Sequence, residues 1–122
     1  MIELARHLGF LLLGGLFVWA AGVHFLTFKD VSSMMAGRGF PAPGFLLAAG
    51  SIVEVAGGLC LILGVGRPYA AAALIVFSIA ATVMLLDFWR YSGIERLNLR
   101  SAFTANLAII GGLLLAATAD LR

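Results

Sequence analysis

The chain has 122 residues, of which 62% are hydrophobic and 11% are charged, and its formal net charge is +2. A water-soluble domain carries roughly a quarter charged residues, so this composition excludes a soluble monomer and favours a lipid bilayer as the solvent. The cationic side chains stand singly at the ends of apolar segments. This pattern indicates contact with membrane lipid headgroups and argues against nucleic acid as a partner.

Four apolar runs follow one another, at about residues 8–28, 45–65, 69–86 and 102–119. Each approaches the roughly 20 residues that an α-helix needs to cross a hydrocarbon core, and buried strands of soluble proteins rarely reach this length. The sequence therefore predicts an all-α integral membrane protein. We expect a single domain over residues 1–122, folded as an antiparallel, up-and-down bundle of four transmembrane helices.

The first run follows Arg6 and carries His24 near its far end. An arginine at this place is typical of a headgroup anchor, and a histidine close to the interface is ordinary for an amphipathic side chain. The loop that follows, "KDVSSMMAGRGFPAPG", holds glycines and prolines that exclude a continuous helix. Ahead of them, Val31 to Met35 are suited to lie along the interface.

The second run, "GSIVEVAGGLCLILGVG", contains Glu54 in its middle. An ionised carboxylate at the bilayer centre costs about 2.5–3.5 kcal/mol on insertion scales. Gly50, Gly57 and Gly64 recur at intervals of seven and place Glu54 on a smooth face that points into the bundle. We expect Glu54 to be protonated, or hydrogen-bonded in a polar pocket. A purely structural carboxyl, bonded to a backbone carbonyl or to Asn106, is the alternative.

The third run ends at Asp87, which either flanks the helix in water or belongs to the pocket. The next loop, "DFWRYSGIERLNLRS", mixes aromatic, aliphatic and charged residues, which indicates a short amphipathic segment at headgroup depth. The fourth run carries Asn106 near its start, as helix glue or as a ligand contact. It also shows a stripe of small residues suited to close helix packing, namely Ala105, Ala108, Gly112, Ala116 and Ala119.

Most polar residues of the four runs lie in the half next to the two long loops. A pocket is therefore expected to open on that side; its candidate residues are His24, Ser51, Glu54, Thr82, Asp87, Thr104 and Asn106. The single cysteine, Cys60, excludes an intramolecular disulfide. No cluster has the spacing of a metal site, and the sequence indicates no covalently bound cofactor.

The blocks around these polar residues resemble the DoxX family of small four-span membrane proteins of bacteria and archaea. The resemblance begins with Arg6 ahead of the first run and continues through "GFPAPG", "EVAGGLCLILGVGRPYAA", "LDFWR" and "NLAIIGGLLLAATA". Its most specific parts are the Glu-x-x-Gly-Gly block that begins at Glu54 and the Asn-Leu-Ala-x-x-Gly-Gly block that begins at Asn106.

This resemblance implies a multi-pass protein of the prokaryotic inner membrane in which Arg6, Glu54 and Asn106 occupy recurrent polar positions. The name-giving members are subunits linked to terminal quinol oxidase and thiosulfate:quinone oxidoreductase, and others are linked to thiol and oxidative-stress handling. It implies a subunit of a respiratory or thiol redox system that binds quinone near Glu54, beside an oxidoreductase partner. Such a subunit is at most quinone-binding or non-catalytic, and its catalytic residues are unknown.

Two other functions fit the same residues. Small multidrug exporters are proton-coupled transporters of this length with one membrane-embedded glutamate, although theirs lies in the first span and Glu54 lies in the second. A homo-oligomer in which two copies of Glu54 face one cavity would suit that function. A purely structural assembly subunit, with Glu54 as a packing device between small-residue stripes, is the other alternative.

Overall fold

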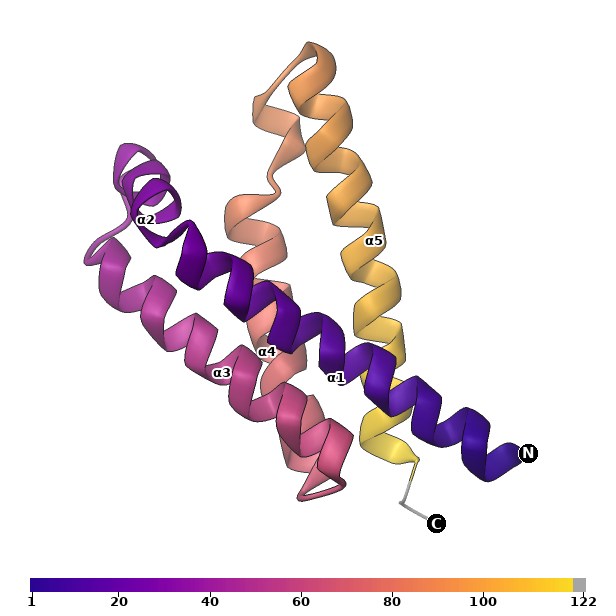
Figure 1. Ribbon diagram of the computed structural model, residues 1–122. Coiled ribbons are helices and arrows are strands. Elements are labelled where there is room, and N and C mark those ends of the chain that lie inside the picture. The colour runs from indigo at the N-terminus through magenta and orange to yellow at the C-terminus, as the bar shows by residue number, and fades with distance from the viewer. Residues whose placement is uncertain (120–122) are drawn as a thin grey trace. The chain divides into compact units, whose positions relative to one another are not determined.

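The computed structural model describes residues 1–119, and every regular element within them is a helix (Figure 1). In chain order, the elements are α1 (Ile2–Leu26), α2 (Phe28–Gly37), α3 (Pro43–Leu63), α4 (Arg67–Leu85), the 3-10 turn η1 (Phe88–Arg90) and α5 (Gly93–Thr118). Four helical segments are long and apolar enough to cross a membrane; they comprise α1, α3, α4 extended through η1, and α5. The predicted all-α membrane class is confirmed.

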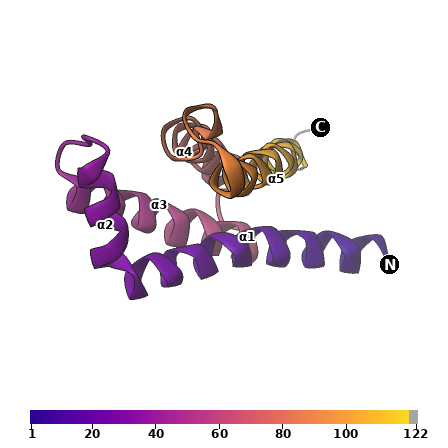
Figure 2. The ribbon, with the colours of Figure 1, turned by 90° about the horizontal axis from the view of Figure 1, so that it is seen from above.

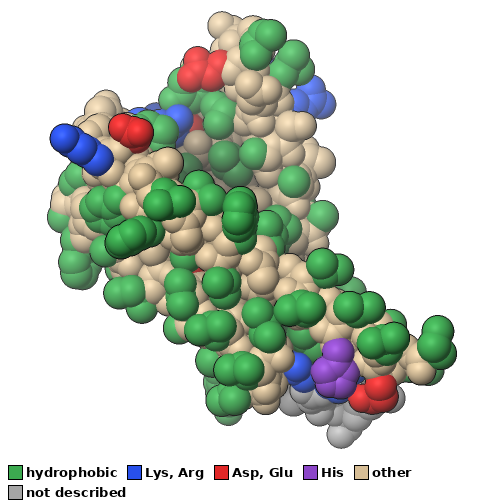
Figure 3. All heavy atoms as spheres, in the orientation of Figure 1, with side chains coloured by type: hydrophobic (Ala, Val, Ile, Leu, Met, Phe, Trp, Pro, Cys, Tyr) green, Lys and Arg blue, Asp and Glu red, His purple; other side chains and the backbone are tan. Residues whose placement is uncertain are grey.

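Apolar side chains also dominate the outer surface. Figure 3 shows them spread over the face in view, with most of the charged side chains near helix ends. Large hydrophobic residues such as Leu12, Trp19 and Leu115 are more than 70% exposed. A surface of this kind is stable in contact with acyl chains rather than with water.

The helices begin earlier than the apolar runs indicate, most clearly in α5. The predicted start of this span was residue 102, whereas the helix begins at Gly93, so the second half of the expected loop is helical. Ser92 precedes the helix in an extended conformation and makes no side-chain capping bond to the first turn of α5, while Glu95 lies in this turn, where the helix dipole favours a negative charge. Hydropathy marks the lipid-embedded part of a helix and not its polar first turns.

The described chain divides into two compact units, the first spanning Met1–Gly66 and the second beginning at Arg67. In the first, α1 and α3 run antiparallel and side by side, and α2 connects them (Figures 1 and 2). α2 contains the segment expected along the interface. Gly64 caps the end of α3; its φ of 78° favours glycine, and its N–H donates to the Cys60 carbonyl at 2.9 Å.

The backbones of α1 and α3 touch where Gly14 faces Gly58. A Cβ added to Gly14 would lie 2.5 Å from the Gly58 carbonyl oxygen, and one added to Gly58 would lie 2.6 Å from the Gly14 oxygen. The buried face of α1 repeats at intervals of four and three, through Phe10, Gly14, Phe17 and Ala21. The buried residues of α3 are Leu47, Glu54, Gly57, Gly58 and Leu61. This spacing is typical of knobs-into-holes packing.

The Gly14–Gly58 contact sets the register of α1 on α3, and with this register the two helices end at different levels. α1 begins twelve residues before Gly14, whereas α3 ends five residues after Gly58. At 1.5 Å per residue, the first turns of α1 therefore stand about 10 Å beyond the end of α3. These turns carry Glu3, Arg6 and His7, the polar residues of α1 that precede its apolar part.

The second unit is a hairpin of α4 and α5, which lie side by side in both ribbon views (Figures 1 and 2). At its turn, the rings of Phe88, Trp89 and Phe103 meet edge to face, with centroids 5.3 to 6.2 Å apart. The Arg96 guanidinium lies over the Phe88 ring at 5.7 Å. Aromatic and cationic side chains of this kind are typical of membrane interfaces. Of the predicted small-residue stripe, Ala116 is buried, whereas Ala105 and Ala108 are exposed.

Candidate functional site

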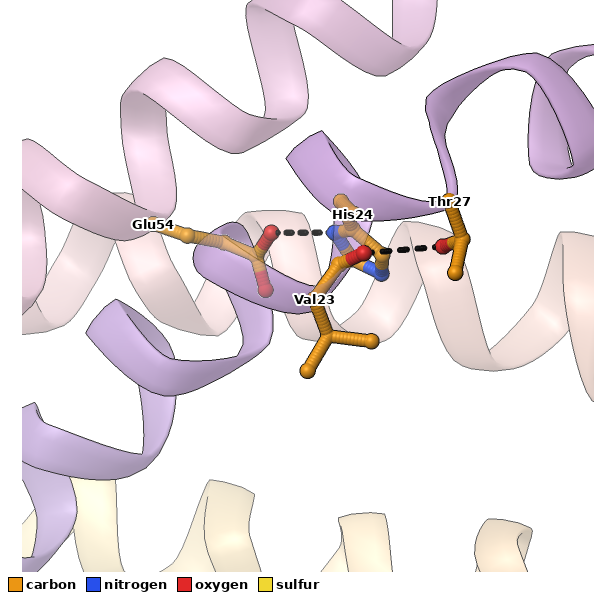
Figure 4. A network of polar contacts seen from close by, with 4 residues as sticks. All are labelled: Val23, His24, Thr27 and Glu54. Carbon is orange, nitrogen blue, oxygen red and sulfur yellow. Dashed lines mark hydrogen bonds and ion pairs between the residues drawn. The ribbon is translucent and has the colours of Figure 1, made fainter.

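The most polar contact inside the first unit joins His24 of α1 to Glu54 of α3. Nδ1 of His24 lies 2.9 Å from Oε1 of Glu54 (Figure 4). The Glu54 side chain is 4% exposed and that of His24 is 31% exposed. Of the two expectations for the carboxyl, hydrogen bonding is the one that the geometry displays, and its partner in this unit is the histidine.

The antiparallel arrangement explains why these two residues meet. His24 follows Gly14 by ten residues and Glu54 precedes Gly58 by four, so they lie about 15 Å and 6 Å from the contact point along their helices. Side chains of a helix lean toward its N-terminus. On antiparallel helices the two side chains therefore lean toward each other, and a long carboxyl and an imidazole close the remaining gap.

The contact allows a proton to pass between the two groups. A hydrogen bond between a carboxyl and an imidazole nitrogen holds one proton, which belongs either to the carboxyl or to the ring. In the first case a neutral carboxylic acid faces a neutral imidazole, and in the second a carboxylate faces an imidazolium. Both pairs have zero net charge. An uncharged pair avoids much of the cost of burying an isolated ion in an apolar span.

Ser51 lies one turn before Glu54 on α3, and its hydroxyl, unlike the Glu54 carboxyl, is not hydrogen-bonded within residues 1–119. The Ser51 Oγ atom is buried and has no hydrogen-bond partner among the residues that the structure describes. The sequence pattern includes Ser51 among the polar residues of this half but gives no reason to prefer it. That its hydroxyl lacks a partner depends on how α3 packs, and no local sequence motif predicts this packing.

The other predicted site residues, Asn106, Asp87 and Arg6, form contacts other than with the His24–Glu54 pair. In the second unit, Nδ2 of Asn106 donates to Oγ1 of Thr82 at 3.0 Å, which joins α5 to α4. Asp87 is buried and forms an ion pair with Arg90 at 3.3 Å. Arg6 lies in the first turns of α1, with its guanidinium 5.4 Å from the centre of the Phe10 ring. Eighteen residues separate Arg6 from His24, so this arginine is not brought to the His24–Glu54 pair.

The arrangement suits protons and polar ligand groups better than a metal ion. Within residues 1–119, no group of three or more His, Cys, Asp and Glu side chains is placed to hold a metal. His24 and Glu54 supply one nitrogen and one carboxylate, fewer ligands than the usual protein metal site.

Comparison with known proteins adds one finding. No match was found among the curated proteins or among the solved structures. The family model of DoxX matches residues 8–87, which include most of α1, all of α2, α3 and α4, and the His24–Glu54 pair. Arg6 and the block that begins at Asn106 lie outside this range. Because the match covers more than half of the chain, and because four helices have the length and apolarity of membrane spans, the protein is a multi-pass membrane protein of the DoxX family.

Proposed function

We propose that this protein is a membrane subunit of a redox system and binds a quinone beside His24 and Glu54. The observation that carries the proposal is the hydrogen bond between a carboxyl and an imidazole, buried between two apolar helices. Quinones are apolar molecules with polar carbonyl groups, so their rings partition into the same helical layer. Reduction of a quinone to a quinol takes up two electrons and two protons.

The chain's own residues are suited to the proton part of this chemistry. Glu54 and His24 share one hydrogen bond and can hold a proton at Oε1 or Nδ1, next to a ligand oxygen. His24 is the more exposed member and links the carboxyl to the protein surface. The electrons in this proposal come from an oxidoreductase partner, because one cysteine cannot support dithiol chemistry.

The proposal is tested by replacing the carboxyl without changing its shape. Glu54→Gln retains the size and a hydrogen-bonding group but cannot exchange a proton. We expect the variant to accumulate normally in membranes and to retain less quinone after purification in mild detergent, measured by solvent extraction and mass spectrometry. Glu95→Gln, at an exposed carboxyl of α5, is the matched control and should retain the wild-type amount. Equal quinone in Glu54→Gln and wild-type protein would contradict the proposal.

A structural subunit is the second candidate, and the backbone contact between Gly14 and Gly58 favours it. Such tight packing stabilises a helix pair whether or not a ligand binds. The quinone content of the same detergent-purified protein distinguishes the two functions. A structural subunit carries no quinone in wild-type protein, and Glu54→Gln then changes thermal stability alone.

A further inference from the structure

The hydroxyl of Ser51 behaves unlike the other helical hydroxyls for which the structure shows bonds. Oγ1 of Thr27, Thr104 and Thr118 each donates to the carbonyl four residues earlier, at 2.8, 2.9 and 3.0 Å. This bond is the usual way in which serine and threonine satisfy themselves within a helix. Ser51 does not make it, and its Oγ is buried with no partner within the described part of the chain.

The register of α1 on α3 places this hydroxyl at the level of the candidate site. Ser51 precedes Gly58 by seven residues and Ala21 follows Gly14 by seven, so both lie about 10 Å from the backbone contact. His24 lies farther from the contact and Glu54 lies nearer to it, and their side chains meet between these levels. By this register Ser51 lies at the level of the His24–Glu54 hydrogen bond, and the residue of α1 at the same distance from the contact is the small Ala21.

Ser51 and Glu54 share a face of α3 because they are three residues apart, with Cβ atoms about 5–6 Å from each other. Two groups at this separation can reach one ligand oxygen. A carbonyl oxygen has two lone pairs and accepts two hydrogen bonds. A buried donor without an acceptor is costly, and a ligand carbonyl supplies the acceptor that α3 itself does not provide.

We propose that Ser51 is a ligand-binding residue whose hydroxyl donates to a quinone carbonyl at the His24–Glu54 pair. This inference rests on the proposed function and adds to it a third contact, together with the ligand group that it recognises. Ser51 fixes the position of the carbonyl by hydrogen bonding, while the histidine and the carboxyl exchange the proton. No bond other than hydrogen bonds forms at Ser51.

The test uses Ser51→Ala because loss of this hydroxyl has opposite consequences with and without ligand. Without quinone, the variant loses an unsatisfied polar group, so its unfolding temperature in detergent should equal or exceed that of wild-type protein. With quinone, it loses one hydrogen bond, so the Kd for decylubiquinone should rise about three- to tenfold. The Kd is measured by quenching of tryptophan fluorescence in ligand-depleted, full-length protein.

Two further variants make the result specific. Ser78→Ala removes a buried serine of α4 in the second unit and should leave the Kd unchanged. Ser51→Cys keeps the side-chain shape with a weaker donor and should give an intermediate Kd. Agreement with these expectations supports the contact.

Failure of this inference differs from failure of the proposed function. If decylubiquinone does not bind to wild-type protein, the proposed function fails and the Ser51 contact fails with it. If Glu54→Gln weakens binding whereas Ser51→Ala leaves the Kd unchanged, the quinone site stands and the role of Ser51 is overturned. A lowered unfolding temperature of ligand-free Ser51→Ala would also overturn it, because the hydroxyl would then stabilise the fold by itself.

Discussion

The burial of Glu54 depends on a partner that the chain supplies from a distant position. Its side chain is 4% exposed and bonded to His24, thirty residues earlier in the sequence. A buried polar group that loses its partner pays a desolvation cost that the intact pair avoids. The pair should therefore contribute to stability mainly through the penalty for breaking it.

His24→Ala is expected to lower stability by about 1–3 kcal/mol, because it leaves the carboxyl buried without this partner. The double variant His24→Ala with Glu54→Leu should recover much of the loss, since no polar orphan remains from the pair. Asn106→Ala is the comparison, with a loss of about 0.6 kcal/mol, the mean for hydrogen bonds between membrane helices. Reversible unfolding in mixed micelles gives all three values. A double variant less stable than His24→Ala would refute this account of the pair.

Sequence reasoning identifies the members of this pair but not their pairing. Glu54 is conspicuous because it is a charged residue in an apolar run, and His24 because it is a polar residue near the end of one. Their contact requires the register of α1 on α3, which is set by Gly14 and Gly58. Gly58 ends the Glu-x-x-Gly-Gly block, but the chain has fifteen glycines, and nothing local pairs Gly58 with Gly14. The orphaned hydroxyl of Ser51 depends on the same register.

At the scale of helices, the first unit is organised by the contact between Gly14 and Gly58. The sequence predicts that Gly50, Gly57 and Gly64 form the smooth face of α3. The structure buries Gly57 but leaves Gly64 exposed at the end of the helix. A helix stripe that faces one partner over several turns alternates steps of four and three, and Gly58 belongs to that stripe. Of the three glycines spaced by seven, only Gly57 is buried, and the close backbone contact with α1 is at Gly58.

This contact predicts different effects for adjacent glycines. Gly14→Ala should destabilise the protein, because the new Cβ would lie 2.5 Å from the Gly58 oxygen and 2.8 Å from Cγ1 of Ile62. Gly15→Ala should be neutral or stabilising, because a Cβ there meets nothing within 4 Å and alanine favours helix by up to about 1 kcal/mol. Thermal unfolding of both variants in one detergent tests the difference. Equal unfolding temperatures would show that α1 and α3 do not touch at Gly14.

At the scale of the whole molecule, hydropathy predicts the class of fold, while the helix bounds require additional local signals. Every apolar run of the sequence lies within a candidate membrane span or ends within three residues of one. A hydropathy pattern does not detect the polar first turns of α1 and α5, because these turns extend beyond the part of each helix that lies in lipid. The order of Ser92 and Glu95 marks the second of these extensions in the sequence, although Ser92 makes no side-chain capping bond to the first turn of α5 in the structure.

Four crossings require that the loops alternate between the two sides of the membrane. In a Cys60→Ala background, single cysteines at Ser33 of α2 and at Glu95 should react with an impermeant maleimide from one side. A cysteine at Gly66, in the turn between α3 and α4, should react from the other. A cysteine at Leu107, which is 54% exposed within α5, should stay unlabelled in intact membranes because lipid surrounds it. Labelling of Ser33 and Gly66 from the same side would contradict the four-span topology.

The His24 side chain is more exposed than that of Glu54, so the two residues differ in how directly a proton from outside can reach them. In the proposed function, a proton that arrives from outside meets the imidazole first and the carboxyl second. With Nδ1 engaged by Glu54, Nε2 carries a proton in both uncharged forms of the pair, so the ring must release that proton before Nε2 can bind another. Under the proposed function, protons therefore reach Glu54 one at a time through His24, and exchange at the ring limits how often the carboxyl is reprotonated.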